Sequence, residues 1–216
     1  MMLPLVVDAT RVRMALIGNG ARAHRRLQLL DEAGATGLVI YAECPSDALA
    51  DAARERLVHR LPNAQELAQA QLVFIADPSP SQRAELAAVA RAGGALVHVE
   101  DVPGLSNLHA PAVVRRGDLT VAVSTAGRSP ALAAHVKRFL DRLFGPEWQT
   151  RIDDLAALRR RWRDTGADAA TLARRTDHWV ESQGWLPAND ATGASSPGTS
   201  DAEATQRSWA IRPSTH

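Results

Sequence analysis

Residues 12–35 have the sequence VRMALIGNGARAHRRLQLLDEAGA, and this stretch decides the fold. Its first six residues are mostly apolar and partly β-branched, which predicts a buried strand. From residue 21 onward, apolar residues recur at helical spacing up to Gly34, which predicts a helix that ends there. A glycine turn at residues 18–20 therefore joins a strand directly to a helix.

The turn and the residues after it match the pattern G-x-G-x-x-G/A. Gly18 permits the tight turn, Gly20 lets the backbone approach a pyrophosphate, and Ala23 lets the helix pack close to the strand. The N–H groups of the helix start, including those of Ala21 and Arg22, then face the phosphates. The pattern predicts dinucleotide binding. The alternative is a glycine turn that merely closes a βα unit.

The alternation of strand and helix continues to about residue 100. Three further apolar runs predict strands at 37–42, 72–76 and 95–100, and helices are predicted after the N-cap Ser46 and over 79–94. Connections this short predict a parallel sheet with helices on both faces, a Rossmann-like α/β domain. Right-handed crossovers place the carboxyl ends of all strands at one edge, where ligands bind.

The residues after the strands are therefore the candidates for cofactor binding. Ala42 and Glu43 follow the second strand, and Asp77 follows the third. Glu43 could accept hydrogen bonds from the ribose hydroxyls, which would favour NAD over NADP, or it is a solvated loop acid. Arg22 and its neighbouring arginines leave NADP open, since an arginine can hold a 2′-phosphate.

Composition excludes several classes of function. The chain has 216 residues, 25 Lys and Arg against 24 Asp and Glu, 45% hydrophobic residues and one cysteine, Cys44. The balanced charge argues against nucleic acid or a membrane surface as partner, and the single cysteine excludes an internal disulfide. No apolar run approaches the roughly 18 residues of a membrane span, and the start does not resemble a secretory signal, so we expect a cytoplasmic protein.

The pattern changes after about residue 112. Two short β runs joined by Arg-Gly-Asp indicate a hairpin, and residues 129–145 predict a helix with Ser129 as N-cap and a proline at its first position. Residues 147–185 are predicted to be helical. The remainder, 188–216, is small, polar and aperiodic, which predicts a disordered tail.

Four segments together resemble the precorrin-2 dehydrogenase/sirohydrochlorin ferrochelatase family, the N-terminal module of bacterial siroheme synthase. They are residues 3–35, 72–82 and 97–143 and the predicted C-terminal helices, which also fit the layout of the family. The segment 97–143 holds the most specific signal: a strand, an acidic turn, a proline, a β segment, and then S-T-x-G-x-S-P opening a helix. The resemblance covers roughly residues 3–185.

The resemblance implies a homodimer with an NAD-binding domain at 1–112, a dimerisation segment at 113–146 exchanged between subunits, and a helical domain at 147–187. It implies NAD-dependent oxidation of precorrin-2 to sirohydrochlorin, followed in many members by Fe²⁺ insertion to give sirohaem. Fused members also carry a methyltransferase domain. The chain is too short for one, so we expect the stand-alone form.

The functional aspartate of the family matches Asp101, in the sequence Glu100-Asp101-Val102-Pro103. Dehydrogenation needs a base for the departing proton, and metal insertion needs an acceptor for pyrrole protons. One carboxylate at the ligand edge of the sheet could serve both. The alternative is a turn acid, which is common before proline.

A loop before the helix at 129–145 is the predicted substrate site. A polycarboxylate substrate can bind backbone N–H groups at a helix start, and a guanidinium binds carboxylate in a bidentate manner. The predicted residues are Ser124, Thr125, Arg128 and Ser129. Ordinary helix capping beside a solvated basic face is the alternative.

Two histidines, His98 and His109, flank Asp101 in the sequence and could guide a transient Fe²⁺. No H-x-x-x-H or H-E-x-x-H pair is present, so we predict no preformed metal site. Two other functions remain open. One is a non-catalytic dinucleotide-sensing module, which needs the glycine turn but no catalytic acid. The other is a tetrapyrrole chelatase without redox activity.

Overall fold

A computed structural model describes residues 2–186, and the tail predicted at 188–216 lies outside them. Strands and helices alternate over the first hundred residues. Their order is β1 (Arg13–Ile17), α1 (Ala21–Glu32), β2 (Gly37–Tyr41), α2 (Asp47–Ala53), the 3-10 helix η1 (Arg54–Arg56), β3 (Leu57–Val58), α3 (Ala64–Gln69), β4 (Leu72–Ile75), α4 (Pro80–Ala92) and β5 (Leu96–Val99).

The five strands form one parallel sheet in the order β3-β2-β1-β4-β5. The chain moves outward in one direction from β1 to β2 and β3, and in the other direction from β4 to β5. The boundary between β1 and β4 is therefore the topological switch point, where a crevice opens at the carboxyl ends of the strands. Gly18 follows β1 and Asp77 lies two residues after β4, so both belong to this crevice.

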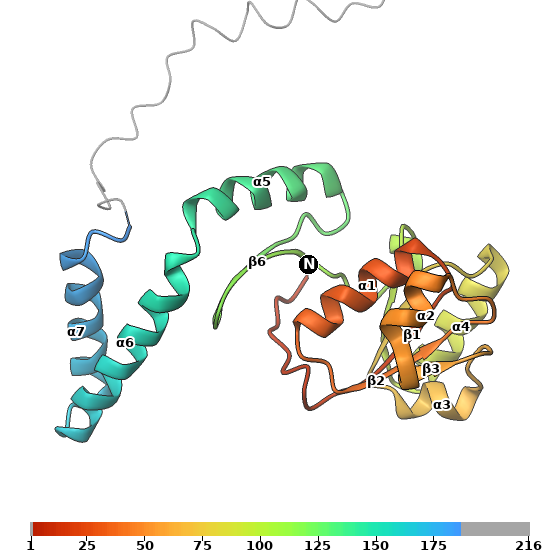
Figure 1. Ribbon diagram of the computed structural model, residues 1–216, viewed down its shortest axis with the longest axis horizontal. Helices are drawn as coiled ribbons and strands as arrows, with labels where there is room; N and C mark the ends of the chain where they lie inside the picture. Colours follow the sequence, from red (N-terminus) through yellow and green to blue (C-terminus); the bar gives the residue numbers. More distant parts are fainter. Residues whose placement is uncertain (1, 187–216) are drawn as a thin grey trace, which may run out of the picture. The chain divides into compact units, whose positions relative to one another are not determined.

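Alternate strand residues face opposite sides of the sheet, and helices cover both sides (Figure 1). On one side Leu16, Ile40 and Phe74 pack with Leu27 of α1 and Leu49 of α2. On the other side, strand residues such as Ile17, Ile75 and Val97 pack with Leu67 of α3 and Leu86 of α4. The predicted Rossmann-like fold class is confirmed.

A small β/α segment follows the sheet domain. Strands β6 (Ala112–Arg116) and β7 (Leu119–Val123) pair as an antiparallel hairpin. Its two-residue turn begins at Gly117, whose φ of +57° favours glycine. Helix α5 (Pro130–Leu143) follows, and the predicted N-cap is confirmed because the Ser129 hydroxyl accepts a hydrogen bond from the Leu132 N–H at 3.3 Å.

The chain divides into two compact units, one ending at Gln149 and the other beginning at Thr150. Helix α6 (Glu147–Asp164) crosses that boundary, and α7 (Ala169–Ser182) follows it. Within the second unit Arg159 donates a hydrogen bond to the Thr176 hydroxyl, which ties α6 to α7. None of the helices within 2–186 is long and apolar enough to cross a membrane.

The structure adds a strand, β3, and a helix, α3, that the sequence did not predict. It also adds the 3-10 helices η1 and η2 (Pro103–Leu105), and it shortens other elements. Strand β3 has only two residues and α3 only six, so neither shows a recognisable hydrophobic period. Helix α2 ends at Ala53, because Arg54 adopts a φ of +50° that no α-helix continues through. The predicted N-cap Ser46 is confirmed, since its hydroxyl accepts from the Leu49 N–H.

Candidate active site

The glycine turn is packed too tightly for any larger residue at its first position. A Cβ atom on Gly18 would lie 2.9 Å from the Cβ of Ala23 and 3.1 Å from the Cβ of Ala76. The Gly18 N–H also donates to the Tyr41 carbonyl at 3.0 Å, which anchors the turn to β2. Helix α1 thus begins directly against the ends of β1 and β4.

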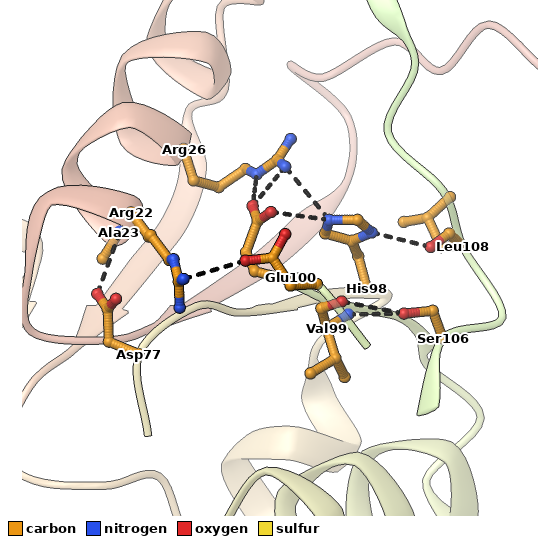
Figure 2. Close-up of polar contacts among 10 residues, drawn as sticks. Arg22, Ala23, Arg26, Asp77, His98, Val99, Glu100, Ser106 and Leu108 are labelled. Atoms are coloured by element: carbon orange, nitrogen blue, oxygen red, sulfur yellow. Dashed lines mark hydrogen bonds and ion pairs between the residues drawn. The ribbon is translucent and has the colours of Figure 1, made fainter. Parts of the chain in front are cut away.

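The side chain of Asp77 closes the turn from the β4 side (Figure 2). Its Oδ2 atom accepts hydrogen bonds from the Gly20 N–H at 2.8 Å and the Ala23 N–H at 3.3 Å. The N–H groups of Ala21 and Arg22 find no partner among residues 2–186. The turn therefore keeps two backbone donors for an anion at the start of α1.

The residue between the two glycines fixes the end of β2 beside the turn. The Asn19 side chain accepts a hydrogen bond from the Cys44 N–H at 3.1 Å, and its carbonyl accepts one from the Ser46 N–H at 2.7 Å. Ala42 is buried under this connection, while Glu43 is exposed. Glu43 therefore lies exposed to solvent at the carboxyl edge of the sheet, after β2.

Asp101 occupies the turn after β5 in a left-handed backbone conformation, with a φ of +59°. Such a conformation costs energy for a residue other than glycine and often accompanies a functional site. The carboxylate is 69% exposed and forms an ion pair with Arg22 of α1, with 3.1 Å between Arg22 Nη2 and Asp101 Oδ2. Asp101 is therefore held toward the start of α1 and remains open to solvent.

The hydroxyl of Ser106 secures the Asp101 turn. It accepts a hydrogen bond from the Val99 N–H at 2.9 Å and lies within 3.2 Å of the Val102 carbonyl, to which it can donate. Ser106 therefore links the residues on both sides of Asp101. Sequence reasoning missed this residue, because a serine after Pro-Gly-Leu has no distinctive spacing.

Arg26, His98 and Glu100 form a charged network, whose contacts Figure 2 shows. The three side chains are largely shielded from solvent. Arg26 of α1 donates to Glu100 Oε1 through Nε at 2.9 Å and also through Nη2. The His98 Nε2 atom lies 3.2 Å from Arg26 Nη2 and 3.5 Å from Glu100 Oε2. Burial acts to raise the pKa of Glu100, but the His98 contact and the charge of Arg26 outweigh it and bring the pKa to about 2.

Both ring nitrogens of His98 have partners. Nδ1 lies 3.1 Å from the carbonyl of Leu108, and Nε2 faces Arg26 and Glu100. The predicted guidance of Fe²⁺ by His98 would require breaking one of these contacts. Within residues 2–186, no group of three or more His, Cys, Asp and Glu side chains is arranged to hold a metal ion.

A cavity of about 310 Å³ opens beside Asp101. Its walls come from the end of β5, the segment around His109, the loop after β7 and the start of α5. Several predicted residues line it together, namely Asp101, His98, His109, Ser124 and Thr125. Two predicted substrate-binding residues, Arg128 and Ser129, do not line the cavity. Arg26 and Glu100, which were not predicted as site residues, do line it.

The predicted substrate loop is braced by its own hydroxyl groups. The Thr125 hydroxyl donates to the Ser129 carbonyl at 3.0 Å and accepts from the Ser129 N–H at 3.1 Å. The Ser124 hydroxyl accepts from the Ala126 N–H at 3.2 Å, and Ala126 has a φ of +52°. Thr125 and Ser129 thus shape the loop, while the cavity wall includes Ser124 and Thr125.

Comparison with known proteins matches two families to this chain. The family described as "Putative NAD(P)-binding" matches residues 5–112, and the family described as "Sirohaem biosynthesis protein central" matches residues 116–143. The first covers the parallel sheet with its glycine turn and Asp101, and the second covers β7 and the whole of α5.

Individual proteins give a similar result. Siroheme synthase 2 of Yersinia pestis (strain Pestoides F) is 31% identical over 183 residues, which are 82% of this chain and 37% of that protein. Siroheme synthase of Pseudomonas entomophila (strain L48) is 33% identical over 165 residues, 75% of this chain and 35% of that protein. The chain thus spans little more than a third of the length of these curated relatives.

One solved structure, described as "SirC, precorrin-2 dehydrogenase", aligns with 87% of this chain and 93% of its own. The TM-score is 0.66 and the sequence identity 18%. At that identity the likeness supports the fold, which includes the sheet domain and the helical C-terminal part.

Proposed function

Because the chain belongs to the NAD(P)-binding family that matches residues 5–112 and also carries the sirohaem biosynthesis central segment, we propose that it oxidises precorrin-2 to sirohydrochlorin with NAD. The observation that carries this proposal is the position of Asp101. Its exposed carboxylate lies at the carboxyl edge of the sheet, borders a cavity of about 310 Å³, and is joined by Arg22 to the start of α1. An exposed carboxylate, a cavity and the glycine turn therefore lie at one edge of the sheet, where a base, a substrate and a dinucleotide would meet.

The residues of the turn fit a dinucleotide. The absence of a side chain on Gly20 would let the backbone approach a pyrophosphate. The N–H groups of Ala21 and Arg22, which have no partner within residues 2–186, would donate to it. Exposed Glu43, after Ala42, would accept from the ribose hydroxyls, which favours NAD. Asp77 lies at the crevice between β1 and β4. NAD, when bound, supplies the hydride acceptor.

Oxidation of the substrate removes two electrons with one hydrogen as hydride and a second hydrogen as a proton. Asp101 would take that proton, and this role is supported by its exposed carboxylate, which borders the cavity. The same carboxylate could accept pyrrole protons if Fe²⁺, as a second substrate, enters sirohydrochlorin. The acetate and propionate arms of the macrocycle would bind at the loop that carries Ser124, Thr125, Arg128 and Ser129.

We also propose that the protein is a cytoplasmic homodimer, with the segment 113–146 exchanged between subunits. Three large apolar side chains of α5 support this proposal, since Leu132, Phe139 and Leu143 are about half exposed, with relative accessibilities of 53%, 54% and 45%. A second copy of the same segment would cover them. Sedimentation of the whole chain tests the stoichiometry.

The deciding experiment incubates the whole chain with precorrin-2 and NAD and follows NADH and sirohydrochlorin by absorbance. Wild type should form both, and Asp101→Asn should bind NAD normally while losing at least about 99% of its turnover. Asp51→Asn, which removes an exposed carboxylate from α2, is the matched control and should keep full turnover.

The other outcomes point to other functions. NAD binding without turnover in wild type would indicate a dinucleotide-sensing module. Metal insertion into sirohydrochlorin, without oxidation of precorrin-2, would indicate a chelatase that lacks redox activity. Normal turnover of Asp101→Asn would remove Asp101 from the mechanism.

A further inference from the structure

The carboxylate of Asp77 lies where a negative charge would repel the pyrophosphate of a bound dinucleotide. A Cβ atom built on Gly20 would lie 3.5 Å from Asp77 Oδ2, 3.7 Å from its Cγ and 3.8 Å from its Oδ1. Glycine at this position lacks the Cβ atom that would hinder a pyrophosphate. The Asp77 carboxylate lies on the side of Gly20 from which that Cβ atom is missing.

The charge of Asp77 is not balanced by a neighbouring side chain. Its contacts are the two backbone N–H groups of Gly20 and Ala23, and no ion pair involves it among residues 2–186. The nearest basic residue of the turn, Arg22, pairs with Asp101 instead. The positive end of α1, which would otherwise favour only a bound phosphate, already holds a carboxylate of the chain itself.

We propose that Asp77 is an affinity-setting residue that weakens dinucleotide binding by placing a carboxylate beside the pyrophosphate position. The inference rests on the proposed binding of NAD at the glycine turn, and it concerns the affinity of that turn for NAD. The two donors that remain, on Ala21 and Arg22, hold the pyrophosphate, while Asp77 repels it. Asp77 also accepts hydrogen bonds from the Gly20 and Ala23 N–H groups, so the shape of the turn does not depend on a bound cofactor.

The substitution Asp77→Asn separates the two effects of this side chain. An asparagine oxygen accepts the same two backbone hydrogen bonds and caps a helix as well as aspartate does, but it carries no charge. We expect Asp77→Asn to bind both NAD and NADP roughly tenfold more tightly, the order of effect that a unit charge has on an anion a few ångströms away in partly exposed surroundings. The gain should shrink at high salt.

The measurement is isothermal titration of the whole chain with NAD and with NADP, at low and at high salt. Asp168→Asn is the matched control, because Asp168 also accepts a backbone hydrogen bond at a helix start, from the Thr171 N–H at 2.8 Å, but belongs to the second unit. Its affinity should equal that of wild type. Asp77→Thr, which also removes the charge, replaces Asp77→Asn if the latter has a lowered Tm.

The results separate this inference from the proposed function. Equal or weaker binding by a folded Asp77→Asn overturns the inference and leaves dinucleotide binding intact. A changed preference between NAD and NADP also overturns it, because it would mean that Asp77 recognises the ribose. Failure of wild type and variants alike to bind either dinucleotide overturns the proposed function itself, and the inference with it.

Discussion

Replacing Glu100 by glutamine removes the negative charge from the network of Arg26, His98 and Glu100. The side chains of Arg26 and His98 are each only 12% exposed and that of Glu100 is 22% exposed. Glutamine keeps the shape and can still accept a hydrogen bond. Arg26 would nevertheless lose its anionic partner while remaining largely buried, a situation that costs far more than loss of a surface ion pair.

The size of the effect follows from the pKa of Glu100, which falls from 4.5 to about 2 in the folded chain. Each pH unit is worth about 1.4 kcal/mol, so the folded carboxylate contributes about 3 kcal/mol at pH 7. Because the folded pKa is depressed, this stabilisation is complete above the unfolded pKa and is lost as the pH falls through about 2. Roughly half of it remains at pH 3.

We therefore expect Glu100→Gln to lower the free energy of unfolding by about 2–3 kcal/mol at pH 7, and by about half of that at pH 3. Urea unfolding of wild type and variant at both pH values, followed by circular dichroism, measures the difference. Glu85→Gln, in an exposed position of α4, is the control and should change little. A loss below about 0.5 kcal/mol at pH 7, or one that does not shrink at pH 3, would refute the reasoning.

Three further substitutions test other parts of the site. Gly18→Ala places a Cβ 2.9 Å from that of Ala23, so titration should show NAD affinity falling at least about tenfold and thermal unfolding a lowered Tm. Ser106→Ala removes the bonds that secure the Asp101 turn, and we expect a loss of about 1–2 kcal/mol in urea unfolding together with a lower kcat. Ser46→Ala removes the N-cap of α2 and should cost about 1 kcal/mol in urea unfolding while leaving NAD affinity unchanged.

The sheet domain could be predicted because its signals are local. Each long strand is a largely apolar run, and the structure confirms the two predicted helix caps, Ser46 and Ser129. Strand β3 was not predicted, because two residues are too few to show a hydrophobic period. Its place in the sheet comes from pairing with β2, which is a tertiary contact.

The candidate site could be predicted only in part. Asp101 was found through the resemblance, and the structure places it beside a cavity with Ser124 and Thr125. The network of Arg26 with Glu100 joins residues 74 positions apart, on α1 and after β5, so no spacing in the sequence indicates it. The same holds for Asp77, whose contact with Gly20 spans 57 positions. Such pairs depend on which strands become neighbours.

The left-handed backbone at Asp101 restricts what can replace this residue over evolutionary time or in a mutant library. Asparagine and glycine tolerate such a conformation, whereas valine, isoleucine and threonine do not. Saturation mutagenesis at this codon should therefore recover folded variants with asparagine or glycine more often than folded variants with the three β-branched residues. Ala126 also has a left-handed backbone conformation, with a φ of +52°, which glycine adopts without strain. Ala126→Gly should therefore raise the Tm and give a more stable protein for crystallisation.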